Sequence, residues 1–294
     1  SLTIQNNPFV GDVNNFSIGA LNTDATSPTT LGEFDVLTVS KSSLIAGSIS
    51  GDGEFVINMT NPQDSVRLGG TMNTYSRGTR IKSGVLDASL DNLPLSPVFN
   101  TIDGTLWLTV NTNQTFTGAI VEGTGHIQLN GPGTFTVNTG VSKFRGTTEV
   151  NETHLIILGL LGGNISNNGI VSGIGTIAGN LNNPTGKVKP GSSIGTLNVK
   201  GNFTQNYTGI YEAEVNNSGQ SDLLNIQGTA TLAGTLSIVV VNGIQDLNQT
   251  FTILNAEGGI EGTFTFVTSN VPTLVPHVTY TQNKVLVNFE HLFV

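Results

Sequence analysis

The best match to a catalytic motif in this sequence is Gly191-Ser192-Ser193-Ile194-Gly195, which fits the pattern Gly-x-Ser-x-Gly. In hydrolases, this pattern presents a nucleophilic serine on a sharp turn that connects a strand to a helix. The residues that follow, Thr196–Val199, alternate polar and apolar side chains, which predicts a strand instead of a helix. We therefore interpret the motif as a turn and assign no catalytic serine.

Two carboxylates are spaced for joint chemistry, at Glu212 and Glu214. Alternate residues of a strand point to the same face, so both side chains would share one surface. Such a pair can bind Ca²⁺ or carry out acid–base chemistry on a glycosidic bond. No aspartate-rich calcium loop accompanies it. A solvated strand face is the favoured interpretation, with a calcium site and a catalytic site as alternatives.

The four histidines are far apart in the sequence, at His126, His154, His277 and His291. None has the His-Glu-x-x-His spacing of a zinc site. A catalytic triad would require a nucleophile and an acid brought close in space, which spacing along one chain leaves open. We expect these side chains to face solvent or to pack against strands.

An arginine precedes a Gly-Thr step twice, at Arg77 and at Arg145. If the chain forms stacked repeats, residues at equivalent positions align in rows. The two arginines would then belong to a ligand-contacting stripe. The favoured alternative is an outward-facing side chain beside a turn.

Composition excludes several classes of function. Charged residues make up 11% of the chain, the formal net charge is −9, and eleven basic residues are scattered along it. Binding to nucleic acid or to anionic membranes is therefore not expected. The absence of cysteine excludes thiolate metal sites and thiol nucleophiles. We expect no cofactor and no metal. Residues 1–3 do not resemble a signal peptide, so we expect a fragment of a longer, processed chain.

Strand signals occur along the whole chain, and helical periodicity is nearly absent. Short segments that alternate apolar and polar residues follow glycine or asparagine turns, as in Gly53–Asn58, Gly104–Val110, Gly133–Val137, Gly234–Val240 and Lys284–Phe289. Their spacing suits a sandwich, a barrel or a solenoid. Internal repetition favours the solenoid, because Gly47–Leu86 can be aligned with Gly118–Leu155. Each turn of a solenoid buries its apolar face against the turns next to it.

Two segments of the sequence resemble signatures of a known family. Lys189–Gln205 reads KPGSSIGTLNVKGNFTQ and Phe251–Phe264 reads FTILNAEGGIEGTF. Both are similar to signatures near the end of bacterial type V autotransporter passenger domains, and the two segments at 47–86 and 118–155 resemble autotransporter-associated β-strand repeats. The resemblance implies an all-β fold, a right-handed single-stranded parallel β-helix with three strands per rung.

The resemblance also implies a folding role for one region. In this family, the part that corresponds to residues 191–266 is associated with an autochaperone activity, in which the last rungs template the others. The residues that carry this motif here are Gly191, Ser193, Ile194, Gly195, Leu197, Gly201, Asn202, Phe203, Asp222, Leu223, Gly228, Phe251, Gly259, Gly262 and Phe264.

We expect four parts along the chain: an irregular N-terminal rung or cap at 1–30, β-helix repeats at 31–190, an autochaperone-like β-helix at 191–266, and terminal strands at 267–294. The resemblance implies a bacterial cell-surface or secreted protein, carried by an outer-membrane β-barrel outside this sequence.

Because no catalytic motif outweighs its structural explanation, the sequence predicts a protein that is not an enzyme. The favoured function is an adhesin or virulence factor that binds a host-cell receptor or an extracellular-matrix molecule. A secreted effector, toxin-like or receptor-activating, is the alternative, followed by a carbohydrate-active β-helix enzyme. A third possibility is a purely structural stalk with the activity elsewhere.

Overall fold

The computed structural model describes residues 2–3, 15–33, 35–94, 99–116, 120–138, 143–244 and 246–292. Of the irregular segment predicted for residues 1–30, residue 1 and residues 4–14 lie outside the described residues. The chain divides into two compact units: unit 1 comprises Ser1–Gly133 and Val141–Thr148, and unit 2 comprises Thr134–Gly140 and Glu149–Val294. Apart from one short 3-10 helix, the regular structure of the described residues is β-strand.

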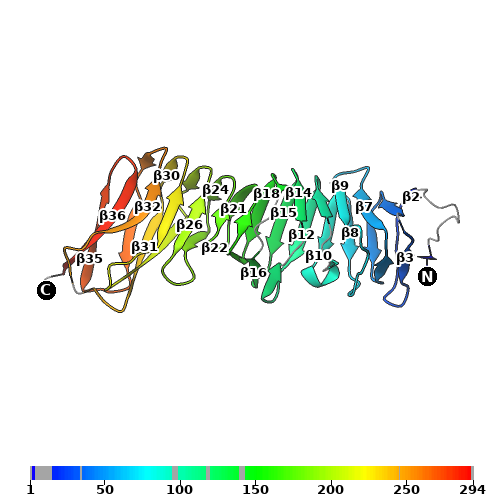
Figure 1. Ribbon diagram of the computed structural model, residues 1–294, viewed down its shortest axis with the longest axis horizontal. Helices are drawn as coiled ribbons and strands as arrows, with labels where there is room; N and C mark the ends of the chain where they lie inside the picture. The colour runs from blue at the N-terminus through cyan, green and yellow to red at the C-terminus, as the bar shows by residue number, and fades with distance from the viewer. Residues whose placement is uncertain are drawn as a thin grey trace. The chain divides into compact units, whose positions relative to one another are not determined.

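Unit 1 consists of short strands that stack in parallel (Figure 1). Its elements are β1 (Leu2–Thr3), β2 (Asn15–Ile18), β3 (Thr29–Leu31), β4 (Val36–Val39), β5 (Ser43–Ile45), β6 (Ile49–Gly51), β7 (Glu54–Asn58), β8 (Ser65–Leu68), β9 (Thr79–Ser83), β10 (Val85–Ala88), η1 (Leu90–Asn92), β11 (Phe99–Ile102), β12 (Thr105–Thr109), β13 (Gln114–Phe116), β14 (Ile120–Gly123), β15 (His126–Asn130) and β17 (Lys143–Phe144). Strand β18 (Thr147–Asn151) crosses the boundary between the units.

Unit 2 has the same construction. Its strands are β16 (Thr134–Val137), β19 (His154–Ile157), β20 (Leu160–Leu161), β21 (Asn164–Asn167), β22 (Ile170–Gly173), β23 (Thr176–Ile177), β24 (Leu181–Asn183), β25 (Lys187–Pro190), β26 (Thr196–Val199), β27 (Phe203–Gln205), β28 (Ile210–Asn216), β29 (Leu223–Ile226), β30 (Ala230–Leu232), β31 (Thr235–Val241), β32 (Phe251–Ala256), β33 (Ile260–Gly262), β34 (Phe266–Ser269), β35 (Leu274–Tyr280) and β36 (Lys284–His291).

The prediction of an all-β solenoid of parallel coils is confirmed, and the sandwich and barrel alternatives are excluded. From β20 to β34, successive strands of unit 2 visit three sheets in turn, so each coil supplies one strand to each sheet. In unit 1, the coils β7–β8 and β9–β10 supply two strands, and connecting segments occupy the third side. Tyr75 in one such segment is buried against Phe55, with ring centroids 6.0 Å apart, which fills the space without a strand.

Rows of inward side chains hold the coils together. One row in unit 2 runs through Leu155, Val171, Val188, Tyr211 and Leu236, which are opposite one another on successive strands. All five side chains are fully buried. Full burial of one aliphatic side chain stabilises a fold by about 1.5–3 kcal/mol. Because every coil adds one member to each row, stability grows with the number of coils rather than with the size of one core.

A buried amide ladder runs beside the aliphatic rows. The Asn167 side chain donates to Asn183 Oδ1 at 2.8 Å, and the Asn183 side chain donates to Gln205 Oε1 at 3.0 Å. The Gln205 amide continues to the carbonyl of Ala233 at 2.9 Å. Burial of these polar groups is tolerated because each has a hydrogen-bond partner on the next coil. These hydrogen bonds fix the position of each coil relative to the next.

The strand pairing changes at the C-terminal end of unit 2. Strand β36 pairs antiparallel with both β32 and β35, whereas the pairings from β19 with β22 to β31 with β34 are parallel. Phe289 on β36 packs on Phe251 of β32, with ring centroids 6.1 Å apart. A parallel edge that would otherwise expose unpaired backbone groups is thereby covered in this sheet.

Candidate functional site

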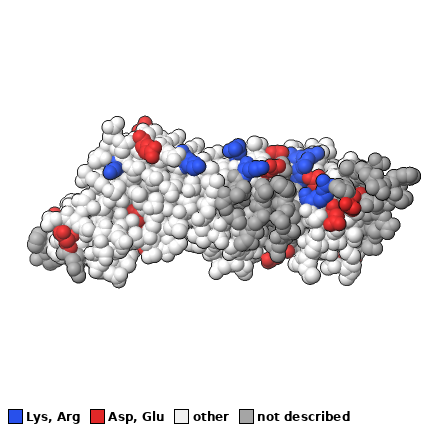
Figure 2. All heavy atoms as spheres, viewed as in Figure 1, with Lys and Arg blue, Asp and Glu red and all other residues white. Residues whose placement is uncertain are grey.

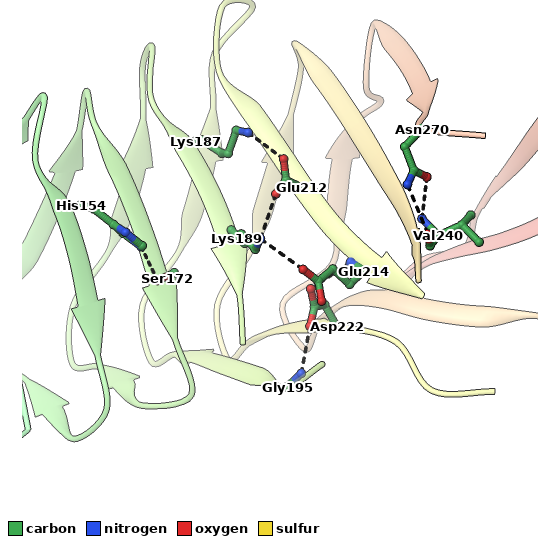
Figure 3. A network of polar contacts seen from close by, with 10 residues as sticks. All are labelled: His154, Ser172, Lys187, Lys189, Gly195, Glu212, Glu214, Asp222, Val240 and Asn270. Atoms are coloured by element: carbon green, nitrogen blue, oxygen red, sulfur yellow. Dashed lines mark hydrogen bonds and ion pairs between the residues drawn. The ribbon is translucent and has the colours of Figure 1, made fainter. Parts of the chain in front are cut away.

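Figure 3 shows charged and hydrogen-bonding side chains along β19, β22, β25 and β28, together with the buried Asp222, which precedes β29. We call the following seven residues the polar cluster: His154, Ser172, Lys187, Lys189, Glu212, Glu214 and Asp222. Alternation places most of them outside the core, because Val171 and Val188, which are neighbours of Ser172 and of both lysines, point inward and are buried. The parallel register then sets Ser172 directly opposite Lys189.

Glu212 and Glu214 lie on one face of β28, as the sequence predicts, but both are engaged by lysines. Lys187 Nζ lies 2.6 Å from Glu212 Oε2. Lys189 Nζ lies 3.3 Å from Glu212 Oε1 and 3.1 Å from Glu214 Oε1. The carboxylate side chains are only 13% exposed, so they form a largely covered chain of ion pairs with the lysines and not a freely solvated face.

The ion pairs shift the protonation of their members. Burial alone would raise the pKa of Glu212, but the hydrogen bonds and charges of Lys187 and Lys189 hold that pKa below its usual range. Burial alone would lower the pKa of Lys189, yet Glu214 and Glu212 raise it. The charged forms are therefore favoured. Among the described residues, no group of His, Cys, Asp and Glu is placed to hold a metal ion, so the calcium alternative finds no support there.

His154 and Ser172 form a contact that sequence spacing did not indicate. His154 Nε2 lies 2.7 Å from Ser172 Oγ on the next strand. Burial, together with the nearby charge of Lys189, lowers the pKa of His154, so its neutral imidazole is favoured. A neutral imidazole beside a hydroxyl is the arrangement that activates a serine nucleophile. Ser172 is only 4% exposed, which leaves little room for a substrate without local opening.

Asp222 anchors the turn that contains the Gly-x-Ser-x-Gly match. One carboxylate oxygen accepts a hydrogen bond from the Gly195 amide at 2.9 Å, and the other accepts one from the Glu214 amide at 2.9 Å. Asp222 is fully buried, and this burial, against the opposing effect of the two amide donors, raises its pKa to about 7. The aspartate thus ties the Gly191–Gly195 turn to the end of β28.

The turn itself confirms the interpretation drawn from the sequence. Ser192 and Ser193 are exposed, and strand β26 follows instead of a helix. Gly191 adopts φ +87, a conformation that favours glycine, and a Cβ there would collide with the carbonyl oxygen of Ser193. Neither serine has a histidine contact in the described structure. The residues form a turn of the solenoid and not a nucleophile elbow.

The remaining residues of the autochaperone-like motif are mainly structural. Leu197, Phe203, Phe251 and Phe264 are buried in the core of unit 2. Asn202 belongs to a second ladder: its side-chain oxygen accepts the amide of Thr229 at 3.0 Å. Gly259 and Gly262 have positive φ angles, and a Cβ at Gly201 or Gly228 would collide with the preceding coil. The side chains of Ile194 and Leu223 are partly buried.

The other histidines show no shared site. His126 and His291 are exposed, while His277 Nε2 lies 2.9 Å from Glu290 Oε1 on the adjacent strand. Arg77 precedes β9 and Arg145 follows β17, so the two arginines lie beyond opposite ends of two strands that β11 and β14 separate in their sheet. They do not form the ligand-contacting stripe that was the alternative to a turn position, and both are exposed.

Comparison with known proteins gives one informative similarity. No protein-family model matches the sequence. A part of the chain is 28% identical, over 176 residues, to a protein named extracellular serine protease from Serratia marcescens. The similarity covers 56% of this chain and 17% of that protein, so the chain spans a minor part of the relative's length. None of the helices in the described part of the chain is long and apolar enough to cross a membrane.

This similarity contradicts the prediction that the chain is not an enzyme, because a protein similar to it is named as a serine protease. The prediction rested on the absence of a convincing local motif. Folding, however, can bring together groups that are distant in sequence, as it does with His154 and Ser172. A motif search along one chain cannot detect such a pair.

Proposed function

We propose that this chain is part of a secreted or surface-exposed passenger of the autotransporter kind, whose outer faces bind host-cell or extracellular-matrix molecules. The observation that carries the proposal is the stack of parallel coils. Its inward side chains supply the stability, and its outward side chains remain available for contacts with other molecules. The extracellular relative from Serratia supports a location outside the cell. Low charge and the lack of cysteine are compatible with that location.

The experiment is a binding assay on the purified chain. The fluorescently labelled protein is applied to cultured epithelial cells and to immobilised fibronectin, laminin and collagen, and binding is followed up to micromolar concentration. Saturable binding to one of these surfaces supports the proposal. No binding to any of them counts against a binding role for this part of the passenger.

We further propose that residues 191–266 nucleate the folding of the stack. New coils need an existing edge on which to add, so folding of a solenoid can begin locally and spread. This region supplies several fully buried aromatic residues, among them Phe203, Tyr211 and Phe251. Asp222 links the turn before β26 to the end of β28, so a contact within about one coil holds this region together.

The relative's name motivates a second candidate, serine protease activity in the protein to which this chain belongs. Within the chain, the contact between His154 and Ser172 is the arrangement that fits such chemistry. A fluorophosphonate probe, which reacts with activated serines, tests this candidate. Labelling that disappears in Ser172→Ala and persists in Ser193→Ala would support a site here. An unlabelled wild-type chain would remove His154 and Ser172 from consideration.

A further inference from the structure

One row of outward side chains in unit 1 combines an exposed aromatic ring with hydrogen-bonding groups. The register of five neighbouring strands sets the following residues side by side in this order: Leu44, Arg67, Asp87, Trp107 and Gln128. We call this set the Trp107 row. The residues before and after Arg67, Asp87 and Trp107 in their strands are buried, so these three point away from the core.

Trp107 is the only tryptophan of the sequence, and 42% of it is exposed on the face of a sheet. Asp87 and Gln128 flank it across the sheet, and Thr105 and Thr109 flank it along β12. A partly exposed indole contributes less to folding than the same area would if it were buried in the core. Its immediate neighbours are hydroxyl, amide and carboxylate groups rather than other apolar side chains.

The polar surroundings extend one position further. His126, which is exposed, lies opposite Thr105, and Asn130 lies opposite Thr109. The ring is therefore surrounded by side chains that can donate or accept hydrogen bonds. Specific small-molecule and cofactor sites combine apolar contact area with a few placed polar groups in this way.

Charge narrows the class of ligand. Arg67 Nε lies 3.8 Å from Asp87 Oδ2, and both side chains are accessible, at 73% and 36% exposure. The pair contributes one positive and one negative charge, so the row favours neither an anionic nor a cationic partner. Charged side chains occur in scattered groups on the face shown in Figure 2, where most of the described surface carries none.

The geometry of the row further restricts the chemical class of the ligand. Neighbouring strands lie about 4.8 Å apart, so the five residues form a straight track that crosses the strands. A protein partner would favour a contiguous apolar patch, whereas Leu44 and Trp107 are separated by Arg67 and Asp87. A sugar ring has an apolar face of C–H groups, which suits an indole, and a rim of hydroxyls, which suits the flanking groups.

From this geometry we infer that the Trp107 row binds a neutral glycan chain, with one sugar ring stacked on Trp107 and its hydroxyls bonded by Asp87 and Gln128. The inference rests on the proposed binding function and gives it a class of partner. It requires no residue of the polar cluster, which lies in unit 2.

Because Trp107 is the sole tryptophan, its fluorescence reports on this row directly. The purified chain is titrated with three soluble neutral polysaccharides (laminarin, galactomannan and dextran) and, as an anionic comparison, with heparin. We expect at least one neutral polysaccharide to shift the emission to shorter wavelength and to protect it from quenching by acrylamide. Heparin should do neither. An unchanged emission and quenching with every neutral probe would overturn the inference.

Substitutions test whether the polysaccharide binds at this row. Each variant is run by affinity electrophoresis in gels that contain the same polysaccharides. Trp107→Ala should weaken retention about tenfold or more, which corresponds to about 1.4 kcal/mol. Tyr207→Ala, which removes another exposed aromatic ring, should retain wild-type binding. Circular dichroism confirms that both variants are folded. Retention of Trp107→Ala equal to wild type would contradict the inference.

The cell-binding assay separates this inference from the proposed function. If the chain binds host cells and Trp107→Ala binds them equally well, while no neutral polysaccharide is bound, the glycan site fails and the proposed function stands. If polysaccharide binding depends on Trp107 but no host cell or matrix protein is bound, the glycan site stands and host binding fails.

Discussion

Asp222 accepts a hydrogen bond from the amide of Gly195, which lies 27 residues earlier in the chain, at a distance of 2.9 Å. The same side chain accepts the amide of Glu214, so both of its oxygens are used. These two hydrogen bonds give the Gly191–Gly195 turn, which matches a nucleophile motif, a structural role: they connect it to β28. It also gives the folding proposal for residues 191–266 a specific contact that can be removed.

Replacing Asp222 should weaken unit 2. Asp222→Ala leaves two amide donors without their acceptor in a buried site, which costs about 1–3 kcal/mol for each unsatisfied group. Urea denaturation followed by circular dichroism measures the loss, and hydrogen exchange should show faster exchange at Gly195 and Glu214. Glu257→Gln, at an exposed position of the same unit, is the matched control and should leave both measurements unchanged.

Stability should also depend on pH through Asp222. Its pKa is about 7 in the folded chain, above the value of 3.8 expected when it is unfolded. The folded state therefore binds the proton more tightly, and the contribution of this group is fully present below its unfolded pKa. That contribution is lost as the pH rises through about 7. The urea midpoint of wild type relative to Asp222→Asn should be higher at about pH 5 than at about pH 8. A difference that is constant, or that grows with pH, would refute this assignment.

The ion-pair chain should contribute to stability, and its contribution should respond to salt. Glu212→Gln removes the carboxylate shared by Lys187 and Lys189, whose side chains are about one-third exposed. The Glu212 side chain is only 13% exposed, so at low ionic strength we expect a loss between the about 0–1 kcal/mol of an exposed pair and the about 3–5 kcal/mol of breaking a buried one. The loss should shrink at high salt, as measured by urea denaturation. A large loss that is independent of salt would indicate a different role for Glu212.

Two buried phenylalanines test where folding starts. Phe203 in β27 and Phe55 in β7 are both fully buried, and replacing either with alanine should cost about 3–5 kcal/mol. If residues 191–266 form the nucleus, Phe203→Ala should slow refolding, whereas Phe55→Ala should mainly speed unfolding. Stopped-flow fluorescence or circular dichroism measures both rates. The reverse pattern would move the nucleus into unit 1.

Much of the fold follows from local alternation in the sequence. The segments expected at Gly53–Asn58, Gly104–Val110 and Lys284–Phe289 correspond to β7, β12 and β36. Alternation identifies which side chains face the core, because that depends on position along one strand. It does not determine which residue of the next coil lies opposite, since loops of variable length intervene.

Contacts that depend on this register could therefore not be predicted from the sequence. His154 and Ser172 are 18 residues apart, and only the pairing of β19 with β22 brings them together. The Trp107 row likewise exists because five strands align. Conversely, a repeat alignment placed Arg77 and Arg145 at equivalent positions, whereas they lie beyond opposite ends of β9 and β17, which β11 and β14 separate. Short motifs reveal the turns of this solenoid, but its surfaces are built by stacking.

We propose that this solenoid binds molecules on the surface of other cells. The most direct measurement is the amount of labelled chain retained on intact epithelial cells, with and without an excess of unlabelled chain. We expect saturable retention that the unlabelled chain competes away and that the acid-unfolded chain lacks. Retention that rises linearly with concentration, without competition, would contradict it.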